Sequence, residues 1–343
     1  MRAVIVALCA LCLLACQRPG LQQQEAYVFG TRVEVIVADA SPEQGRQAIA
    51  TVLREFDRLH QAYHAWQPSE LTALNAAIAA GRPHRVSPEL AGLIRNAQAI
   101  AARGDHLFDP GIGRLVALWG FQSDTFKPQR PAAEALAAWR AARPSIAHLQ
   151  ISPDHVVTSR NPQVALDFGG YLKGWALDRA ATLLRAQGIN NALINIGGNI
   201  LALGSKGGRP WRVGIQHPRQ PGPLASLALH DGEAIGSSGD YQRYFELEGR
   251  RYPHLLDPRS GEPVQHTQAV SVIIPAGPEA GTLSDATSKP LFIAGPQAWR
   301  EGARNQGLQL FLRVTAEGTV QVSAALKSRL EFADHNYQVE TLP

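Results

Sequence analysis

A pair of glycines at the start of an apolar-periodic helix constrains this chain more than any other feature. Residues 167–178 read Asp-Phe-Gly-Gly-Tyr-Leu-Lys-Gly-Trp-Ala-Leu-Asp and follow an apolar run that ends at Leu166. Adjacent glycines at a strand-to-helix turn let the backbone approach another molecule closely, and the first amides of the helix attract an anion. A second pair, Gly197-Gly198, follows the next apolar strand. The two turns together predict a site for a phosphorylated ligand.

Signals for regular structure along the rest of the chain favour an α+β fold. Ser-Pro-Glu at 41–43 and again at 87–89 gives a helix cap followed by proline at the first helical position. Residues 131–143 and 281–294 also read as helices, although Pro290 should kink or end the second. Strands are expected at 26–37, 192–196, 211–216, 241–247, 268–274, 308–314 and 319–322. Early helices, late strands and the lack of Gly-x-Gly-x-x-Gly argue against a doubly wound sheet.

Composition limits the classes of function. The chain has 343 residues, 45% of them hydrophobic, which is enough for one large or two moderate domains. Its net charge of +4 and the lack of a basic stripe interleaved with aromatic residues argue against a nucleic-acid partner. All three cysteines lie within the first sixteen residues, so the remainder has no disulfide, thiol nucleophile or cysteine metal site.

The first residues predict export and lipid anchoring. Arg2 precedes an apolar run over 3–15 that is too short to span a membrane as a mature helix. The run ends Leu-Leu-Ala-Cys, which resembles the lipobox of bacterial lipoproteins, cleaved before Cys16 and acylated there. We expect a signal peptide at 1–15, a flexible tether at 16–25, and a mature protein on the periplasmic side of an inner or outer membrane. A plain secretory signal is the alternative.

Two polar stretches come before or within turns. Asp109 precedes Pro110-Gly111, which places a carboxylate ahead of a rigid turn; a carboxylate bonded to its own turn backbone is the alternative to a site role. Residues 235–241, Ile-Gly-Ser-Ser-Gly-Asp-Tyr, form a hydroxyl-rich segment that by itself reads as a turn before an aromatic strand.

Two further stretches pair titratable groups. His254 and Asp257 lie three residues apart, so His254 could act as a general base near neutral pH with Asp257 orienting it; a structural histidine is the alternative. Asp285 and Lys289 share one face of the expected helix at i, i+4. A surface ion pair of little energetic consequence is the alternative there.

In their order and spacing these stretches resemble the ApbE family of FAD:protein FMN transferases. Phe29-Gly30-Thr31 is similar to the family's Met-Gly-Thr, and residues 69–75, Ser-Glu-Leu-Thr-Ala-Leu-Asn, are similar to its Ser-Glu-Leu-Ser-x-Leu-Asn. Further matching blocks are 108–113, 118–121, 167–178, 211–215, 238–241 and 254–261. The resemblance implies a flavin-transferase domain over 26–343, as one body or two intertwined subdomains, with T-fold-like sheets flanked by helices.

The resemblance also implies an activity and a site. The family binds FAD and Mg²⁺ outside the cytoplasm, moves the FMN half to a threonine hydroxyl of a flavoprotein subunit in a membrane redox complex, and releases AMP. His254, Asp257 and Lys289 are then the expected catalytic residues. The residues expected to bind FAD are Phe29, Tyr63 or Trp66 (one of which stacks on the flavin), Leu107, Phe108, Asp109, Asp167, Gly169, Gly170, Lys173 and Leu256.

One departure from the family concerns the metal. The family's Asp-Ala-x-x-Thr helix supplies an Asp and a Thr to Mg²⁺, and a backbone carbonyl at the place of Leu172 completes the site. Here Asp285-Ala286 is kept, but Lys289 replaces the threonine. An ammonium has no lone pair for a metal. Lys289 either stands in for the metal in an active transferase or marks a loss of catalysis. The alternatives to a transferase are a flavin-binding lipoprotein without activity and an FAD pyrophosphatase that yields FMN and AMP.

Overall fold

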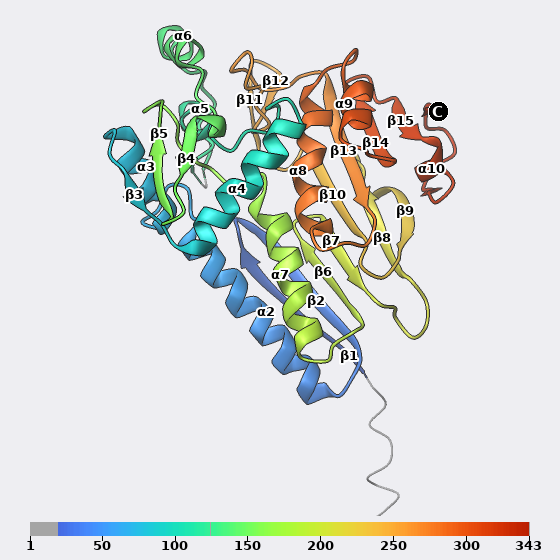
Figure 1. Cartoon of the computed structure of the whole chain (residues 1–343). Coiled ribbons are helices and arrows are strands. Elements are labelled where there is room, and N and C mark those ends of the chain that lie inside the picture. Colours follow the sequence, from blue (N-terminus) through green and yellow to red (C-terminus); the bar gives the residue numbers. More distant parts are fainter. Residues whose placement is uncertain (1–19, 124, 343) are drawn as a thin grey trace, which may run out of the picture.

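A mixed sheet of nine strands forms the centre of the computed structural model, which describes residues 20–123 and 125–342 (Figure 1). Neighbouring strands in this sheet are antiparallel except the last pair, β15 and β17. In spatial order the strands are β1 Gly20–Val28, β2 Thr31–Ala40, β6 Ala192–Ile196, β7 Asn199–Leu203, β10 Ala234–Gly239, β13 Thr267–Ile274, β14 Leu310–Thr315, β15 Val320–Ser323 and β17 Val339–Leu342.

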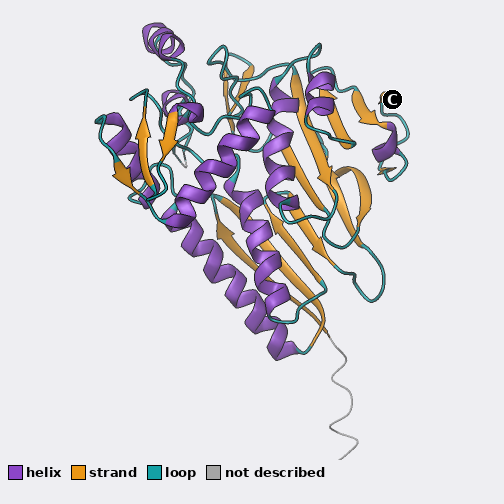
Figure 2. Cartoon of the chain, viewed as in Figure 1, coloured by secondary structure: helices purple, strands orange, loops and turns teal. Residues whose placement is uncertain are grey.

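Helices cover one face of this sheet, as Figure 2 shows in purple against the orange strands. Helix α2 (Pro42–Ala62) packs on β1 and β2, α7 (Leu172–Ala186) on β6 and β7, and α8 (Ala280–Ile293) on β10 and β13. The opposite face is covered by a three-stranded sheet of β8 (Trp211–Gln216), β9 (Pro223–Leu229) and β16 (Glu331–Phe332). The predicted α+β class, with sheets flanked by helices, is confirmed.

Two smaller groups of elements complete the structure beside the helix layer. One contains α3 (Glu70–Ala79), α4 (Pro88–Arg103) and the strands β3 (His84–Arg85), β4 (Leu149–Ile151) and β5 (Val156–Ser159). The other joins α5 (Gly113–Leu118) and α6 (Ala133–Ala142) to the hairpin of β11 (Tyr244–Leu247) and β12 (Arg250–Pro253) through one aromatic-rich core. Near the C-terminus, α9 (Trp299–Asn305) follows α8, and α10 (Ala324–Lys327) follows β15.

The helix starts follow from local sequence. Ser41 and Ser87 have extended backbones, and their side chains accept hydrogen bonds from the amides of Gln44 and Leu90. Proline follows each serine at the first helical position, and α4 ends at Gly104, as predicted. The helix predicted at 131–143 is also confirmed as α6.

Several expectations about local structure were wrong. Residues 20–25, expected as tether, lie in β1 and pair with β2. The single strand expected at 26–37 is the β1–β2 hairpin, which turns at Phe29-Gly30. Residues 235–239 form β10 inside the sheet rather than a turn, because the sheet pairs this segment on both sides. The helix expected at 281–294 is confirmed as α8, but it does not end at Pro290.

The second glycine pair also differs from expectation. Gly197 and Gly198 join β6 to β7 with φ of 57° and 92°, so they form a hairpin turn rather than a turn into a helix. The predicted signal peptide, the cleavage point and Cys16 lie outside the described residues. Within the described residues, none of the helices has the length and apolar character needed to cross a bilayer.

Candidate functional site

A cavity of about 970 Å³ opens where the β1–β2 turn, the end of α2 and the turn before α7 meet β10 and the two segments that flank the β11–β12 hairpin. This volume is at the upper end of the range for ligand pockets. Every described residue that the sequence predicted for the site lines the cavity, except Asp257. These residues are Phe29, Tyr63, Trp66, Leu107, Phe108, Asp109, Asp167, Gly169, Gly170, Leu172, Lys173, His254, Leu256, Asp285 and Lys289.

A row of aromatic rings forms one wall of the cavity. The ring centroids of Phe29 and His60 lie 5.8 Å apart, those of His60 and His64 4.9 Å, and those of His64 and Trp66 4.5 Å. The Arg243 guanidinium lies 6.0 Å from the centroid of Trp66. Such a wall suits a planar ligand that stacks on aromatic faces.

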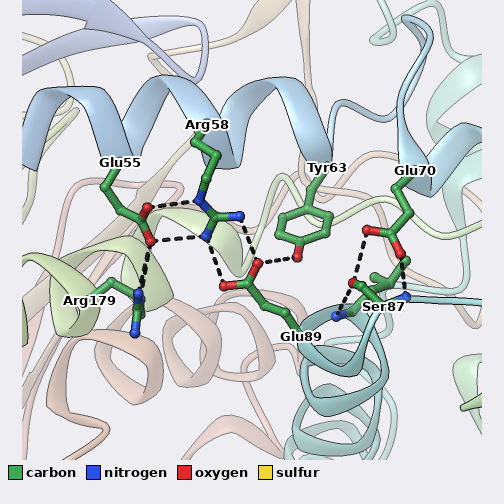
Figure 3. Close-up of polar contacts among 8 residues, drawn as sticks. Glu55, Arg58, Tyr63, Glu70, Ser87, Glu89 and Arg179 are labelled. Carbon is green, nitrogen blue, oxygen red and sulfur yellow. Dashed lines mark hydrogen bonds and ion pairs between the residues drawn. The ribbon is translucent and has the colours of Figure 1, made fainter.

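Tyr63 and Trp66 differ in their availability to a ligand. Tyr63 is 3% exposed, and its hydroxyl donates to Glu89 at 2.7 Å. Glu89 also accepts two hydrogen bonds from Arg58, which bonds Glu55 as well (Figure 3). This network fixes the Tyr63 ring between α2 and α4. Trp66 is only partly buried and projects from the loop after α2, so it is the better placed of the two to stack on a ligand.

His254 is held in one tautomer by the backbone. Its Nδ1 lies 3.0 Å from the Arg243 carbonyl oxygen, to which it can only donate. The Nε2 atom is therefore the acceptor of the neutral ring. Burial, together with the positive charges of Arg243, Lys173 and Lys289, lowers the pKa of His254 to about 3. The ring is neutral at physiological pH and can accept a proton at Nε2.

The predicted role of Asp257 was wrong. Its carboxylate accepts a hydrogen bond from the Arg259 amide at 2.8 Å and another from the Arg259 guanidinium at 2.8 Å. Arg259 also donates to the Ile293 carbonyl and so ties this turn to the end of α8. The nearness of Asp257 and His254 in sequence misled the prediction, because the backbone carbonyl of Arg243 orients the imidazole instead.

The glycine turn before α7 uses most of its polar groups internally. The Gly169 amide donates to Asp167 at 2.9 Å, and the Lys173 ammonium donates to the Gly169 carbonyl at 2.9 Å. The amides of Tyr171 and Leu172 both donate to the Phe168 carbonyl. Within residues 20–123 and 125–342, the Gly170 amide has no hydrogen-bond partner. Of the two glycine amides predicted to bind phosphate, that of Gly170 is the one available.

The Asp109 carboxylate bonds to its own turn, which was the alternative to its predicted role in nucleotide binding. One carboxylate oxygen accepts from the amides of Gly111 and Ile146, each at 2.8 Å. The other accepts from Ser145 Oγ at 2.5 Å and lies 3.2 Å from His106 Nδ1. Asp109 is 6% exposed. Its contacts join residues 109–111 to residues 145–146 beside the cavity.

Asp285 and Lys289 form a buried ion pair, so the alternative of a surface pair is excluded. Asp285 is fully buried and Lys289 is 8% exposed. The ammonium contacts one carboxylate oxygen of Asp285 and donates to the Asp285 backbone carbonyl at 2.7 Å. The other carboxylate oxygen accepts from the Gly174 amide at 3.0 Å. Burial opposes ionisation of Asp285, but the positive charges of Lys289 and Lys173 outweigh it and lower the pKa of Asp285. Burial and the positive charge of Lys173 lower the pKa of Lys289.

These contacts bear on the magnesium that the family resemblance implies. Mg²⁺ takes oxygen ligands in near-octahedral geometry. Here both oxygens of the Asp285 carboxylate already have partners, and one partner is a cation. No group of three or more His, Cys, Asp or Glu side chains within the described residues could hold a metal ion. The predicted pair of Asp285 and the Leu172 carbonyl therefore does not fit Mg²⁺ while Lys289 is in place.

Some cavity residues were not foreseen as site residues. Arg243 positions His254, donates to the Phe121 carbonyl at 2.8 Å and faces the Trp66 ring. Ser238 Oγ lies 2.8 Å from Ser288 Oγ and joins β10 to α8 at the cavity. Ser238 lies in a block that carried the resemblance, but no local pattern in the sequence singles out Arg243. Other lining residues that were missed are Thr31, His60, His64, Gln216, Ser237, Tyr241 and Gln242.

Comparison with known proteins gives a consistent result. Residues 29–312 match the ApbE family. A Rhodobacter capsulatus FAD:protein FMN transferase is 39% identical over 312 residues, which is 91% of this chain and 58% of that protein. The Klebsiella pneumoniae FAD:protein FMN transferase is 33% identical, over 82% of this chain and 81% of that protein.

Solved structures agree with this match. The crystal structure of an ApbE protein from Thermotoga maritima superposes with a TM-score of 0.83 at 28% identity, covering 90% of this chain and 99% of that one. The flavin transferase ApbE from Vibrio cholerae has a TM-score of 0.77 at 25% identity, covering 91% and 99%.

Proposed function

This chain belongs to the ApbE family, and we propose that it transfers the FMN part of FAD to a hydroxyl group of an acceptor protein. The observation that carries the proposal is a single cavity with an aromatic wall and a cationic region. His254 lines this same cavity with its accepting Nε2 atom. A flavin dinucleotide needs a stacking surface for its ring and positive charge for its pyrophosphate.

The reaction follows from the groups in the cavity. The acceptor hydroxyl loses its proton to His254 Nε2, and its oxygen bonds to the phosphorus of the FMN phosphate. The bond between that phosphorus and the bridging oxygen breaks, and the oxygen leaves with AMP. Lys173 and Lys289 stabilise the negative charge on the phosphates as it develops. Trp66 stacks on the isoalloxazine, and the Gly170 amide donates to a phosphate oxygen.

The setting of the reaction is also part of the proposal. We propose a threonine as the acceptor residue, in a flavin-carrying subunit of a membrane redox complex. The lipobox-like sequence supports anchoring through acylated Cys16 on the periplasmic side of a bacterial membrane. Magnesium takes no step here, because the Asp285 carboxylate is paired with Lys289.

The decisive experiment supplies the purified protein with FAD and an acceptor domain. A matched acceptor in which the target threonine is changed to alanine is the control. Transfer gives in-gel flavin fluorescence and an FMN mass increment on the threonine acceptor alone, with one AMP released for each flavin attached.

The other outcomes contradict the proposal in different ways. Free FMN with AMP and an unlabelled acceptor would identify an FAD pyrophosphatase. Bound but intact FAD would identify a flavin-binding protein without transfer activity.

A further inference from the structure

We infer that the Lys289–Asp285 pair is a built-in cation site for the phosphates of FAD, so that this chain binds FAD without a divalent metal. The inference rests on the proposed function for the identity of the ligand. It adds that the positive charge at the phosphates comes from the protein itself.

The position of Lys289 supports this inference. A Cβ atom placed on Gly170 would lie 3.2 Å from Lys289 Cε, so the lysine stem lies against the glycine turn. Gly170 also carries the amide without a partner in the described part of the chain, and that amide is the other expected phosphate donor. The Lys289 ammonium and this amide therefore serve the same region of the cavity.

The charged residues around the Lys289–Asp285 pair also favour binding of an anion. Lys173, Arg243 and Lys289 all line the cavity. The carboxylates of Asp109 and Asp167 accept hydrogen bonds from turn amides, and that of Asp285 accepts from Gly174 and Lys289. An anion entering the cavity meets cations and an amide donor, an arrangement that favours a pyrophosphate.

The Lys289–Asp285 pair also disfavours binding of a divalent cation at Asp285. A divalent cation at Asp285 would have to displace the ammonium or lie beside it, and like charges repel strongly in a buried site. The hydroxyl protons of two nearby α8 residues go to backbone carbonyls: Thr287 donates to the Leu283 carbonyl at 2.6 Å, and Ser288 to the Asp285 carbonyl at 2.7 Å. One ammonium thus occupies the place where oxygen ligands would be needed.

The test measures FAD binding by the purified full-length protein from quenching of flavin fluorescence, in EDTA and in millimolar MgCl₂. Riboflavin, which lacks phosphate, is the ligand control. Lys289→Met removes the charge and keeps the length of the side chain. Lys289→Thr supplies a neutral oxygen in its place. Lys206→Thr, at an exposed lysine outside the cavity, is the matched protein control.

We expect the wild-type protein to bind FAD equally in EDTA and MgCl₂. Lys289→Met should weaken FAD binding by about 10- to 100-fold, the range for loss of one charge-assisted hydrogen bond, and leave riboflavin binding unchanged. Lys289→Thr should bind FAD weakly in EDTA and recover in MgCl₂. Lys206→Thr should match the wild type.

Because Lys289→Met leaves a buried carboxylate unpaired, it could unfold the protein. The double variant Asp285→Asn/Lys289→Met removes both charges and supplies the same comparison in a folded protein. Wild-type FAD binding that is lost in EDTA and restored by Mg²⁺ would overturn the inference, as would unchanged FAD affinity in the double variant. Metal-independent FAD binding without flavin transfer would refute the proposed function and leave this inference standing.

Discussion

His254 is the residue at which burial and chemistry are most closely linked. The ordinary pKa of a histidine is about 6.5, and burial with three neighbouring cations lowers the pKa of His254 to about 3. The ring is therefore neutral at pH 7, but the lowered pKa makes it a weak base while the cavity holds no anion. Binding of the negatively charged FAD should raise this pKa, which makes the base stronger when substrate is present.

The lowered pKa predicts a pH-dependent contribution to stability. Unfolded His254 takes up a proton near pH 6.5 and the folded ring resists it, so stability is full above pH 6.5 and is lost as pH falls toward 3. His254→Asn removes this term. We expect the wild type to lose on the order of 1–2 kcal/mol more unfolding free energy than the variant between pH 7.5 and pH 5. Urea unfolding of both proteins at the two pH values checks this; parallel losses would contradict it.

The two aromatic candidates for flavin stacking also separate by experiment. Trp66→Ala removes the partly exposed ring of the cavity wall and should weaken FAD and riboflavin binding alike, by about 5- to 30-fold. Tyr63→Phe keeps the ring and loses only the hydrogen bond to Glu89, so it should lower stability by about 1 kcal/mol with little change in affinity. Flavin fluorescence titrations and thermal unfolding give both readouts. Unchanged flavin affinity in Trp66→Ala would contradict a stacking role for Trp66.

Among the elements, α7 and α8 approach each other closely near the site. Both helices carry a glycine there: a Cβ on Gly174 would lie 2.3 Å from the Gly281 carbonyl oxygen and 2.6 Å from Asp285 Cβ. Asp178 of α7 also accepts hydrogen bonds from the amides of Gly281 and Thr282, at 2.7 and 2.8 Å, and so caps the start of α8. The close approach brings Asp285 within reach of the Gly174 amide.

This contact predicts the effect of a single added methyl group. Gly174→Ala should force the helices apart, lower the unfolding free energy by about 1–3 kcal/mol and weaken FAD binding, because Asp285 and Lys289 move with α8. Gly92→Ala is the matched control: Gly92 is an exposed position of α4 with nothing within 4 Å of an added Cβ, so the change should stabilise the protein slightly. Equal stability of the two variants would show that the α7–α8 contact is not tight.

For the whole molecule, the large sheet extends further toward the N-terminus than the sequence suggested. Residues 20–25 form the first part of β1, an edge strand, and Gln22 packs against Gly45 of α2. The cavity lies at the other end of this strand, where Val28 and Phe29 line it. The edge strand therefore supports both the sheet and one wall of the site.

Two truncations test this. A protein that starts at Gly20 should have the same stability and FAD affinity as one that starts at Cys16. A protein that starts at Ala26 loses five cross-strand pairs with β2, from Gly20↔Ala40 to Glu25↔Glu34, and should lose about 1–5 kcal/mol of unfolding free energy. Chemical denaturation measures the difference. Equal stability of the two would restore the expectation of a flexible tether.

Local sequence by itself determined the elements whose signals are short in range. Serine caps followed by proline started α2 and α4 where expected, because a cap depends only on the first turn of its own helix. The α+β class also followed from the order of helix and strand signals. The ordered motifs gave fifteen residues that line the cavity, although many of its other lining residues were missed. These motifs fall in turns, and the tertiary structure brings them together around one cavity.

Tertiary structure alone decided what each polar group does there. Asp257 has Arg259 as its partner, His254 is oriented by a backbone carbonyl, and Asp285 and Lys289 are buried instead of exposed. Strand β10 was mistaken for a turn because its pairing comes from β7 and β13, which are distant in sequence. Burial and hydrogen-bond partners depend on residues far away along the chain, so spacing within one segment could not reveal them.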